Sequence, residues 1–156
     1  MRTVGAGDRR QRWIDSFHTS YNVCALLDYQ RITGDSSFER AMLTGHRYYQ
    51  AAFFTEEGAP KYFHNRVFPI DIHACSQAIL HFATLSSIDP TALELASKTF
   101  HWTATNMAAA DGSFYYQRHR LWTHRTPYMR WGQAWMFRAL ACLLTANGSF
   151  VTQVGL

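Results

Sequence analysis

Apolar side chains recur along most of this chain at the three- and four-residue spacing of α-helices. The spacing predicts helices over residues 15–33, 37–54, 72–85, 93–107 and 130–145. The first, third and fifth are apolar on nearly every face, which predicts burial all round. The second and fourth keep a charged face and should meet water on one side. The predicted order is therefore buried, amphipathic, buried, amphipathic, buried.

Short and long connections alternate between these helices. Short turns follow the first and third helices, whereas long loops rich in aromatic and polar residues, 55–70 and 109–129, follow the second and fourth. Gly34 suits the end of the first helix, and Asp89 before Pro90 suits the start of the fourth. Because the helices of a hairpin run in opposite directions, the long loops should gather at one end of the molecule.

The starts of the buried helices repeat along the sequence. Asp15 and Asp71 each follow an isoleucine and lie 56 residues apart, and Met129 stands another 58 residues on. Gly58 and Gly112 mark matching loops before the second and third starts. A period of about 57 residues indicates units that bury their apolar faces on one another. Buried helices backed by amphipathic ones imply two concentric layers, so the predicted fold class is all-α, a partial (α/α) toroid of helical hairpins.

Composition fits a globular chain and excludes several partners. Of the 156 residues, 47% are hydrophobic and 17% charged, which excludes disorder. No apolar run reaches the roughly 18 residues that span a membrane. The net charge of +4 comes from 13 arginines and two lysines, but no basic block follows the pattern of a nucleic-acid-binding surface. We therefore expect no nucleic-acid partner and no membrane partner.

Cysteine usage and the N-terminus point to a reducing compartment. Cys24, Cys75 and Cys142 are odd in number, lie in apolar runs and form no CxxC pair, so buried free thiols are expected. Residues 1–12 are polar and carry no secretory signal, which favours a cytoplasmic location. No standard metal-ligand spacing is present, and neither a metal nor a cofactor is expected. The expected division is a flexible basic N-terminus over 1–12, the toroid segment over 13–147 and a C-terminal tail over 148–156.

Four segments carry a resemblance to a known family: residues 33–35 (TGD), 58–63 (GAPKYF), 68–73 (FPIDIH) and 127–135 (PYMRWGQAW). Through them, residues 12–145 resemble uncharacterised bacterial members of the six-hairpin glycosidase-like superfamily, which are often found near polysaccharide biosynthesis functions. The resemblance implies an (α/α) toroid and a role in carbohydrate metabolism. The superfamily includes hydrolases, sugar epimerases and polysaccharide lyases, so the resemblance leaves the reaction open.

The number of hairpins departs from that family. A closed ring has six hairpins, whereas a period of about 57 residues gives this chain about two and a half. We therefore expect it to be the C-terminal half of a longer protein or a shortened gene product. The apolar faces at both ends of such an arc should be covered by missing sequence or by another chain, which includes self-association.

Asp15 and Asp71 are the leading catalytic candidates, because they occupy equivalent positions at the long-loop end. Glycoside hydrolysis needs two carboxylates about 5 to 9.5 Å apart, but aspartate is also a good helix N-cap, and both interpretations stay open. His18 and His73 follow these acids closely. An acid can orient an imidazole for the proton transfer of an epimerase or lyase, although a histidine at a helix start also bonds or stacks locally. We predict Asp15 and Asp71 as acid and base and His73 as a proton shuttle.

Aromatic, hydroxyl and cationic side chains of the long loops are candidates for sugar binding, although the aromatic rings could instead pack the loops onto the helices. Arg130 lies at a helix start, where its charge opposes the helix dipole and needs a partner. That partner could be the carboxylate of a uronate ligand, or Asp15 or Asp71. The predicted substrate-binding residues are His18, Tyr21, Lys61, Tyr62, Gln77, Tyr115, Tyr116, Arg130, Trp131 and Gln133.

Two functions follow from these observations. The first is a carbohydrate-active protein that binds or processes an oligosaccharide or polysaccharide at the long-loop mouth, as a glycoside hydrolase or as a sugar epimerase or lyase. The second is a non-catalytic helical-repeat module that completes its ring with another chain.

Overall fold

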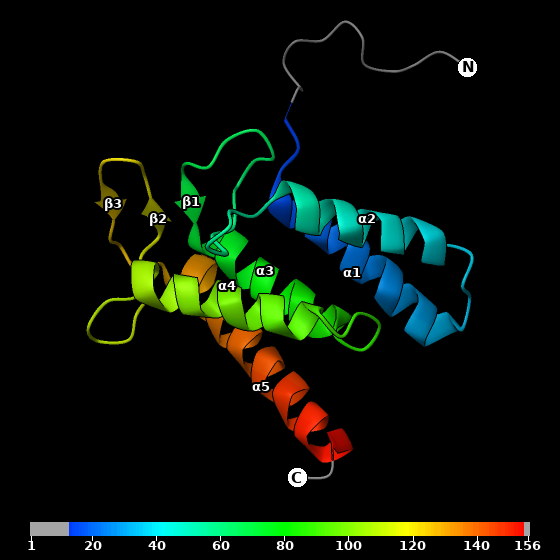
Figure 1. Ribbon diagram of the computed structural model, residues 1–156. Helices are drawn as coiled ribbons and strands as arrows, with labels where there is room; N and C mark the ends of the chain where they lie inside the picture. The colour runs from blue at the N-terminus through cyan, green and yellow to red at the C-terminus, as the bar shows by residue number, and fades with distance from the viewer. Residues whose placement is uncertain (1–12, 155–156) are drawn as a thin grey trace, which may run out of the picture.

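The computed structural model describes residues 13–154, so the basic N-terminus expected over 1–12 lies outside the described residues. Five α-helices confirm the number and order that the periodicity predicts (Figure 1). They are α1 (Ser16–Thr33), α2 (Glu39–Ala52), α3 (Ile72–Leu85), α4 (Ala92–Met107) and α5 (Ala134–Val154), the last preceded by a π-helical turn over Met129–Gln133. No helix in this part of the chain is long and apolar enough to cross a membrane.

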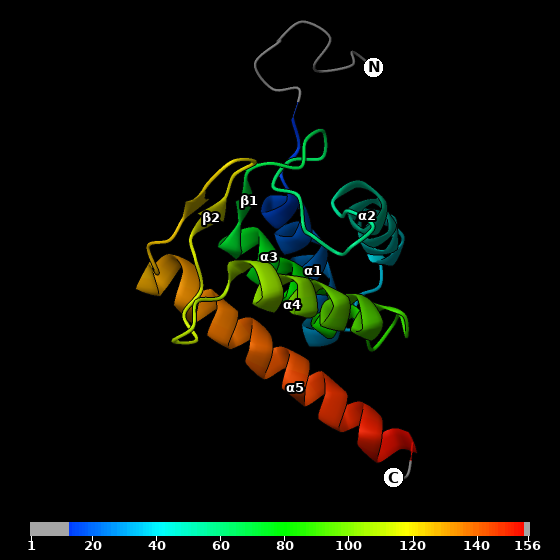
Figure 2. The ribbon, with the colours of Figure 1, turned by 60° about the vertical axis from the view of Figure 1, so that its left-hand side comes forward.

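The helices form two layers around α3. Helices α1 and α5 pack on either side of α3, while α2 covers α1 and α4 covers α3 (Figures 1 and 2). Thus α1, α3 and α5 form the inner layer, and α2 and α4 form the outer layer. The prediction of a mainly helical, partial (α/α) toroid is confirmed.

Burial of the inner helices depends on their place in the arc. Every residue of α3 except Thr84 is buried, as the sequence predicts. The prediction of all-round burial is wrong for the other two, because Ile32 on α1 is 83% exposed and Phe137 and Leu144 on α5 are 77% and 72% exposed. Helices α1 and α5 stand at the two edges of the arc, where no further described helix covers them. Periodicity reports an apolar face but not which neighbour is present.

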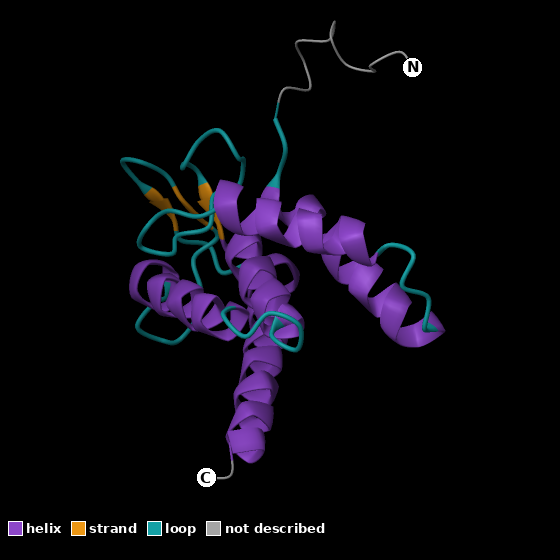
Figure 3. Cartoon of the chain, turned by 45° about the vertical axis from the view of Figure 1, so that its right-hand side comes forward, coloured by secondary structure: helices purple, strands orange, loops and turns teal. Residues whose placement is uncertain are grey.

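A small antiparallel sheet joins the two long loops, which the sequence pattern had predicted to be irregular. Its strands are β1 (Ile70–Asp71), β2 (Gln117–Arg118) and β3 (Thr123–His124), in that order. Figure 3 shows the sheet and the loops gathered at one end of the molecule. Strands of two residues carry too short an alternating pattern for detection in the sequence.

The repeat of about 57 residues is visible in the backbone. The first residue of α1 donates its N–H to the carbonyl of Tyr62, and the first residue of α3 donates its N–H to the carbonyl of Tyr116, at 2.9 and 3.0 Å. Both loops turn at a glycine in the left-handed region, Gly58 at φ 91° and Gly112 at φ 84°. The two mouth loops are therefore built alike and attach to their inner helices at the same point.

Helix α5 ends later than the sequence predicts. It continues to Val154 rather than stopping at residue 145, so the tail expected over 148–156 is helical as far as 154; residues 155 and 156 lie outside the described part. Gly148 does not end the helix. A glycine in a helix interior costs only about 1 kcal/mol relative to alanine, and no proline follows it.

Candidate functional site

The candidate site lies where the long loops meet the N-terminal ends of α1 and α3, beside the sheet (Figure 1). Asp15 and Asp71 are the N-cap residues of these two helices. Each carboxylate accepts a backbone N–H from its helix, His18 N–H for Asp15 and His73 N–H for Asp71, both at 2.8 Å. The capping interpretation is therefore realised at both positions, because these bonds satisfy donors that a helix start otherwise leaves unpaired.

The second oxygen of each carboxylate has its own partner. Asp15 Oδ2 lies 2.9 Å from Nδ1 of His18, whose side chain is 69% exposed. This contact fixes the orientation of an exposed imidazole through its Nδ1. Asp71 Oδ2 accepts a hydrogen bond of 2.7 Å from Nε2 of Gln117, and the residue is only 2% exposed. Burial raises the pKa of Asp71, while the bonds from Gln117 and the His73 backbone act to lower it.

His73 lies in a cage of aromatic rings. Its Nε2 is 2.9 Å from the hydroxyl of Tyr21. Its ring stacks on Trp135, with centroids 4.9 Å apart, and meets Trp131 edge to face at 4.7 Å. Burial lowers the pKa of His73, and the nearby His18 lowers it further. The imidazole is therefore neutral at pH 7 and able to accept a proton.

Phe17 and Tyr62 join the two halves of the site. The ring of Phe17 lies 4.2 Å from that of His18, 5.3 Å from that of His73 and 5.5 Å from that of Tyr62, between centroids. Burial raises the pKa of Tyr62, and the charges of Asp71 and Asp15 raise it further. The structure thus brings together six of the predicted residues: Asp15, His18, Tyr21, Tyr62, Asp71 and His73.

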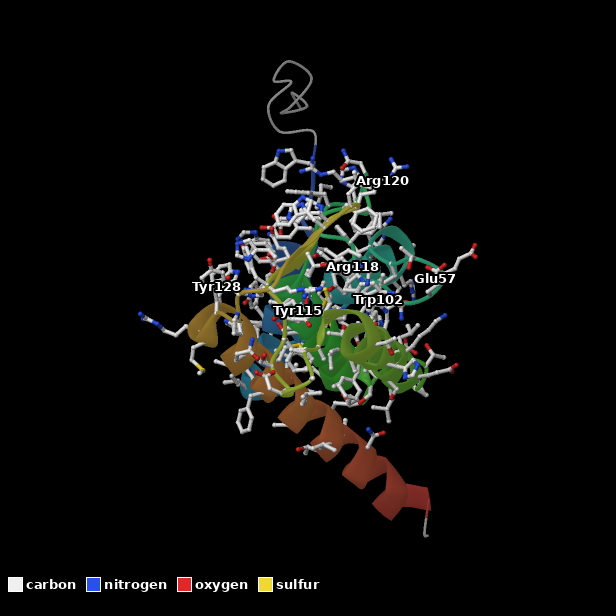
Figure 4. All side chains as sticks on the ribbon, turned by 90° about the vertical axis from the view of Figure 1, so that its left-hand side faces the viewer. Glu57, Trp102, Tyr115, Arg118, Arg120 and Tyr128 are labelled. Atoms are coloured by element: carbon white, nitrogen blue, oxygen red, sulfur yellow. The ribbon has the colours of Figure 1, made fainter. Side chains whose placement is uncertain are left out.

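An open hollow of about 320 Å³ adjoins this cluster and is lined by Tyr116, Tyr128 and Trp131. The rings of Tyr116 and Tyr128 meet edge to face at 5.0 Å. Figure 4 shows Tyr128 and Tyr115 projecting on this side of the molecule. Two of the predicted binding residues, Tyr116 and Trp131, therefore line one aromatic surface beside His73.

A second and larger hollow, of about 520 Å³, lies elsewhere. It is at the short-turn end, between α3, α4 and α5, and its lining includes Arg31, Thr84 and Pro90 but no histidine or carboxylate. His73, a predicted catalytic residue, lies instead beside the smaller hollow through its contact with Trp131, so the mouth is the better candidate site.

Three predicted binding residues have contacts of their own within the loops or with the adjoining helix. Lys61 Nζ donates to the carbonyl of His64 within its own loop at 3.3 Å. Tyr115 carries the guanidinium of Arg125 over its ring at 5.6 Å. Gln133 uses both amide atoms on the backbone of Phe114, at 2.8 and 2.9 Å. The structure joins none of these three to His73 by a described contact.

Arg130 is exposed and forms no ion pair with a described residue. Of the two kinds of partner that the sequence leaves open for Arg130, the internal pair with Asp15 or Asp71 is therefore not formed. The reason is that His18 and Gln117 already occupy the free oxygens of those carboxylates. Gln77 also lies apart from the mouth surface. It is buried in α3 and donates through Nε2 to Ser20 Oγ at 2.9 Å.

Four residues of the site were missing from the sequence-based candidates: Phe17, Gln117, Tyr128 and Trp135. Phe17 and Tyr128 read in the sequence as ordinary apolar and loop residues. Gln117 reaches Asp71 only because β1 pairs with β2, in the register Asp71 opposite Gln117. In the matching of the two long loops, Tyr62 corresponds to Tyr116 and Phe63 corresponds to Gln117. This correspondence could have pointed to Gln117 as a residue at the mouth. Within residues 13–154, no three His, Cys, Asp or Glu side chains are arranged to hold a metal ion.

Neither a family model nor a curated protein sequence matches this chain. Solved structures do match. A cellobiose 2-epimerase from Bacillus thermoamylovorans superposes with a TM-score of 0.71 at 10% identity, over 86% of this chain and 40% of its own. The cellobiose 2-epimerase from Spirochaeta thermophila superposes with a TM-score of 0.74 at 12% identity, over 87% of this chain and 39% of its own. The GH76 alpha-mannanase of Bacteroides thetaiotaomicron superposes with a TM-score of 0.64 at 12% identity, over 90% of this chain and 45% of its own.

At such identities the similarity defines the fold. The chain has the architecture of a segment of an (α/α) toroid, as the resemblance implies for its fold. It spans less than half of the length of each of these three proteins.

Proposed function

We propose that this chain is the sugar-binding part of a carbohydrate-active toroid and takes part in proton transfer on the bound sugar. One observation carries the proposal: His73, hydrogen-bonded to Tyr21, is packed against Trp131 and Trp135 at the mouth. The structurally similar proteins, two cellobiose 2-epimerases and an alpha-mannanase, are named for carbohydrate substrates, which favours the same class of ligand.

The surface beside His73 suits a sugar ring. Sugars present apolar C–H faces and polar edges, which match aromatic rings that carry hydroxyl groups. Tyr116, Tyr128 and Trp131 supply both around a hollow of about 320 Å³, within the size range of small-ligand pockets. A uronate unit is favoured by the exposed guanidinium of Arg130 next to Trp131, and its carboxylate would supply the partner that Arg130 lacks.

The proposed chemistry uses the two imidazoles. Neutral His73 takes a proton, relayed by the Tyr21 hydroxyl, from the carbon next to the carbonyl or carboxylate of the sugar. His18, held at Nδ1 by Asp15, returns a proton to the opposite face of that carbon. The carbon loses one proton and gains one, so the step inverts its configuration without an external oxidant. A lyase would instead expel the adjacent glycosidic oxygen from the same carbanion.

Asp15 and Asp71 enter the proposal mainly as groups that position the histidines. Each has one oxygen on a helix N–H and the other on a side chain. Hydrolysis by this carboxylate pair is the competing reaction, with the raised pKa of the buried Asp71 suited to a general acid. The three cysteines are free thiols, which supports the proposed cytoplasmic location.

The test is solvent deuterium exchange. The chain is incubated in D₂O with cellobiose, with a uronate oligosaccharide or with α-mannan oligosaccharides, and the sugars are analysed by NMR and mass spectrometry. Deuterium at the carbon next to the carbonyl or carboxylate is expected, with loss in His73→Gln and retention in the control His101→Gln, which alters an exposed residue of α4. Chain cleavage without deuterium at that carbon would favour hydrolysis, and no change in any sugar would reject the catalytic proposal.

A second candidate function is a non-catalytic module that completes its ring with another chain. The observation that favours it is the apolar stripe on α5, where Phe137 and Leu144 lie two turns apart on one face and are both exposed. Size-exclusion chromatography with light scattering tests it. A dimer that Phe137→Glu converts to monomer would support this function, and a monomer at all concentrations would count against self-association.

A further inference from the structure

Five polar side chains form a continuous hydrogen-bonded row through the core. Gln77 Nε2 donates to Ser20 Oγ at 2.9 Å, and Ser20 Oγ lies 3.1 Å from His81 Nδ1. His81 Nε2 lies 2.9 Å from His46 Nδ1, and His46 Nε2 lies 2.9 Å from Asp89 Oδ2. The row crosses α1, α2 and α3 and ends in the α3–α4 turn. None of its three central members was a candidate from the sequence.

The row reaches solvent at one end only. Gln77, Ser20, His81 and His46 are all buried, whereas Asp89 is partly exposed. A buried polar group must find its partner inside the protein, since an unpaired donor or acceptor is costly there. The protonation of each imidazole is therefore fixed by its two neighbours in the row, and donor and acceptor roles can be assigned from one end to the other.

With both imidazoles neutral, every hydrogen bond from Ser20 onward points toward Asp89. The carboxylate only accepts, so His46 carries its proton on Nε2 and accepts at Nδ1. His81 must then donate from Nε2 and accept at Nδ1, where the Ser20 hydroxyl donates. Gln77 donates its amide N–H to Ser20 Oγ and thereby completes the row.

A second proton on His46 reverses this direction. Doubly protonated His46 donates at both nitrogens, to Asp89 and to His81 Nε2. His81 stays neutral only by moving its own proton to Nδ1, from which it donates to Ser20 Oγ. The Ser20 hydroxyl must then find another acceptor. Gln77 Oε1 is buried and has no hydrogen-bond partner, so a half-turn of the amide about its last bond presents that oxygen to Ser20.

We propose that this row is a proton-operated switch. Protonation of His46 keeps its hydrogen bond to Asp89 and reverses the three hydrogen bonds that join His46 to Gln77 through His81 and Ser20. Asp89 near the surface thereby controls the orientation of the Gln77 amide, which lies one helical turn below His73 on α3. The proposal is independent of any sugar chemistry at the mouth.

The environment of the two histidines favours His46 as the site of the added proton. Burial and, to a smaller extent, the neighbouring His46 lower the pKa of His81 to about 3, so His81 resists a positive charge. Although burial acts to raise the pKa of Asp89, hydrogen bonds from His46, Thr91 and Gln50 hold it well below its ordinary value. A carboxylate that stays ionised supplies the counter-charge for a protonated His46.

Few other titratable groups face the row. Cys24 of α1 lies 3.8 Å from His81 Nδ1, and Tyr49 of α2 packs its ring on that of His81 at 4.3 Å. Burial raises the pKa of both. Gln50 of α2 reaches Asp89, while Arg138 and Cys142 of α5 act on Cys24. Within the described residues, Asp89 is therefore the carboxylate that contacts an imidazole of the row directly, at His46.

The switch is tested by NMR on the uniformly ¹⁵N-labelled chain. Long-range ¹H–¹⁵N correlation spectra of the imidazoles identify which ring nitrogens carry protons, and they are recorded from pH 8 downward. At pH 8 both histidines should carry the proton on Nε2. As His46 gains its second proton, His81 should remain neutral and change to the Nδ1–H form with the same midpoint.

Several results would overturn the proposal. They are a His81 that keeps its Nε2 proton while His46 is charged, a His81 that becomes charged first, and unfolding before His46 takes up its proton. Asp89→Asn keeps an oxygen for the bonds from Thr91 but removes the counter-charge. The midpoint of the tautomer change of His81 should therefore move to lower pH. His101→Gln, outside the row, should leave it in place. An unshifted midpoint in Asp89→Asn would also contradict the mechanism.

Discussion

The Nε2 atom of His73 lies 2.9 Å from the hydroxyl of Tyr21, and this contact joins the start of α3 to the second turn of α1. Tyr21→Phe removes the hydroxyl and leaves the aromatic packing on Trp135 in place. We expect a loss of about 1 kcal/mol in the free energy of unfolding, since a buried imidazole nitrogen loses its partner. Urea denaturation measures it. Unchanged stability would mean that the hydrogen bond contributes nothing to the folded state.

Asp71 allows capping to be separated from catalysis. Asp71→Asn keeps an oxygen that caps α3, so the stability at pH 7 should change little, because the buried charge is also removed. Asp71→Ala removes the cap and leaves Gln117 without its partner, which should cost about 2 to 4 kcal/mol. Thermal melts of both variants compare them. If Asp71→Asn is stable but inactive on a sugar that the parent chain converts, the carboxylate takes part in the reaction.

Gly45 lets α2 approach α1 closely. A Cβ added at this position would meet Cγ2 of Val23 at 2.8 Å. Gly45→Ala should therefore destabilise the chain by about 1 to 3 kcal/mol through overpacking between the two helices. Gly148→Ala is the matched control, because its Cβ meets no atom within 4 Å and alanine is the better helix former. Chemical denaturation should show a lower free energy of unfolding for Gly45→Ala and a higher one for Gly148→Ala. Equal changes in the two variants would contradict the close packing of α1 on α2.

Stability should fall in acid. Burial holds the pKa of His73 below its ordinary value and lowers that of His81 to about 3. Below pH 6.5 the unfolded chain therefore binds more protons at these positions than the folded chain, so unfolding becomes easier as the pH falls toward 3. Denaturation at pH 7 and pH 4.5 measures the loss. His81→Asn should be less stable at pH 7 but lose less between the two values, whereas His101→Gln should keep the slope of the parent chain.

The helices could be predicted because their signal is local. The bounds of α3 match the expectation at both ends, and Gly34 ends α1 with the expected left-handed backbone, φ 73°. The repeat also held in three dimensions, since Asp15 and Asp71 cap equivalent helices. Burial could not be predicted in the same way. Ile32 and Phe137 belong to apolar faces, but their exposure depends on which helices are present beside them.

The site was only partly predictable, for a related reason. The repeat placed His73 at a helix start and Tyr21 on an inner helix, so both were candidates. Their contact with Trp135 needs the packing of three helices. The row through His46 and His81 left no local signal at all. Successive partners in the row lie 57, 61, 35 and 43 residues apart, and no motif links them before the chain folds.

The mouth beside His73 is proposed to bind a sugar. The most direct test is to follow the indole N–H signals of the tryptophans by NMR while cellobiose, a uronate oligosaccharide or α-mannan oligosaccharides are added. Saturable shifts of the Trp131 and Trp135 signals are expected with at least one of these sugars. Trp102 on α4, which is outside the site, serves as the internal reference and should not move (Figure 4). Trp131 and Trp135 signals that stay in place with every sugar, or that move no more than Trp102, would contradict sugar binding at the mouth.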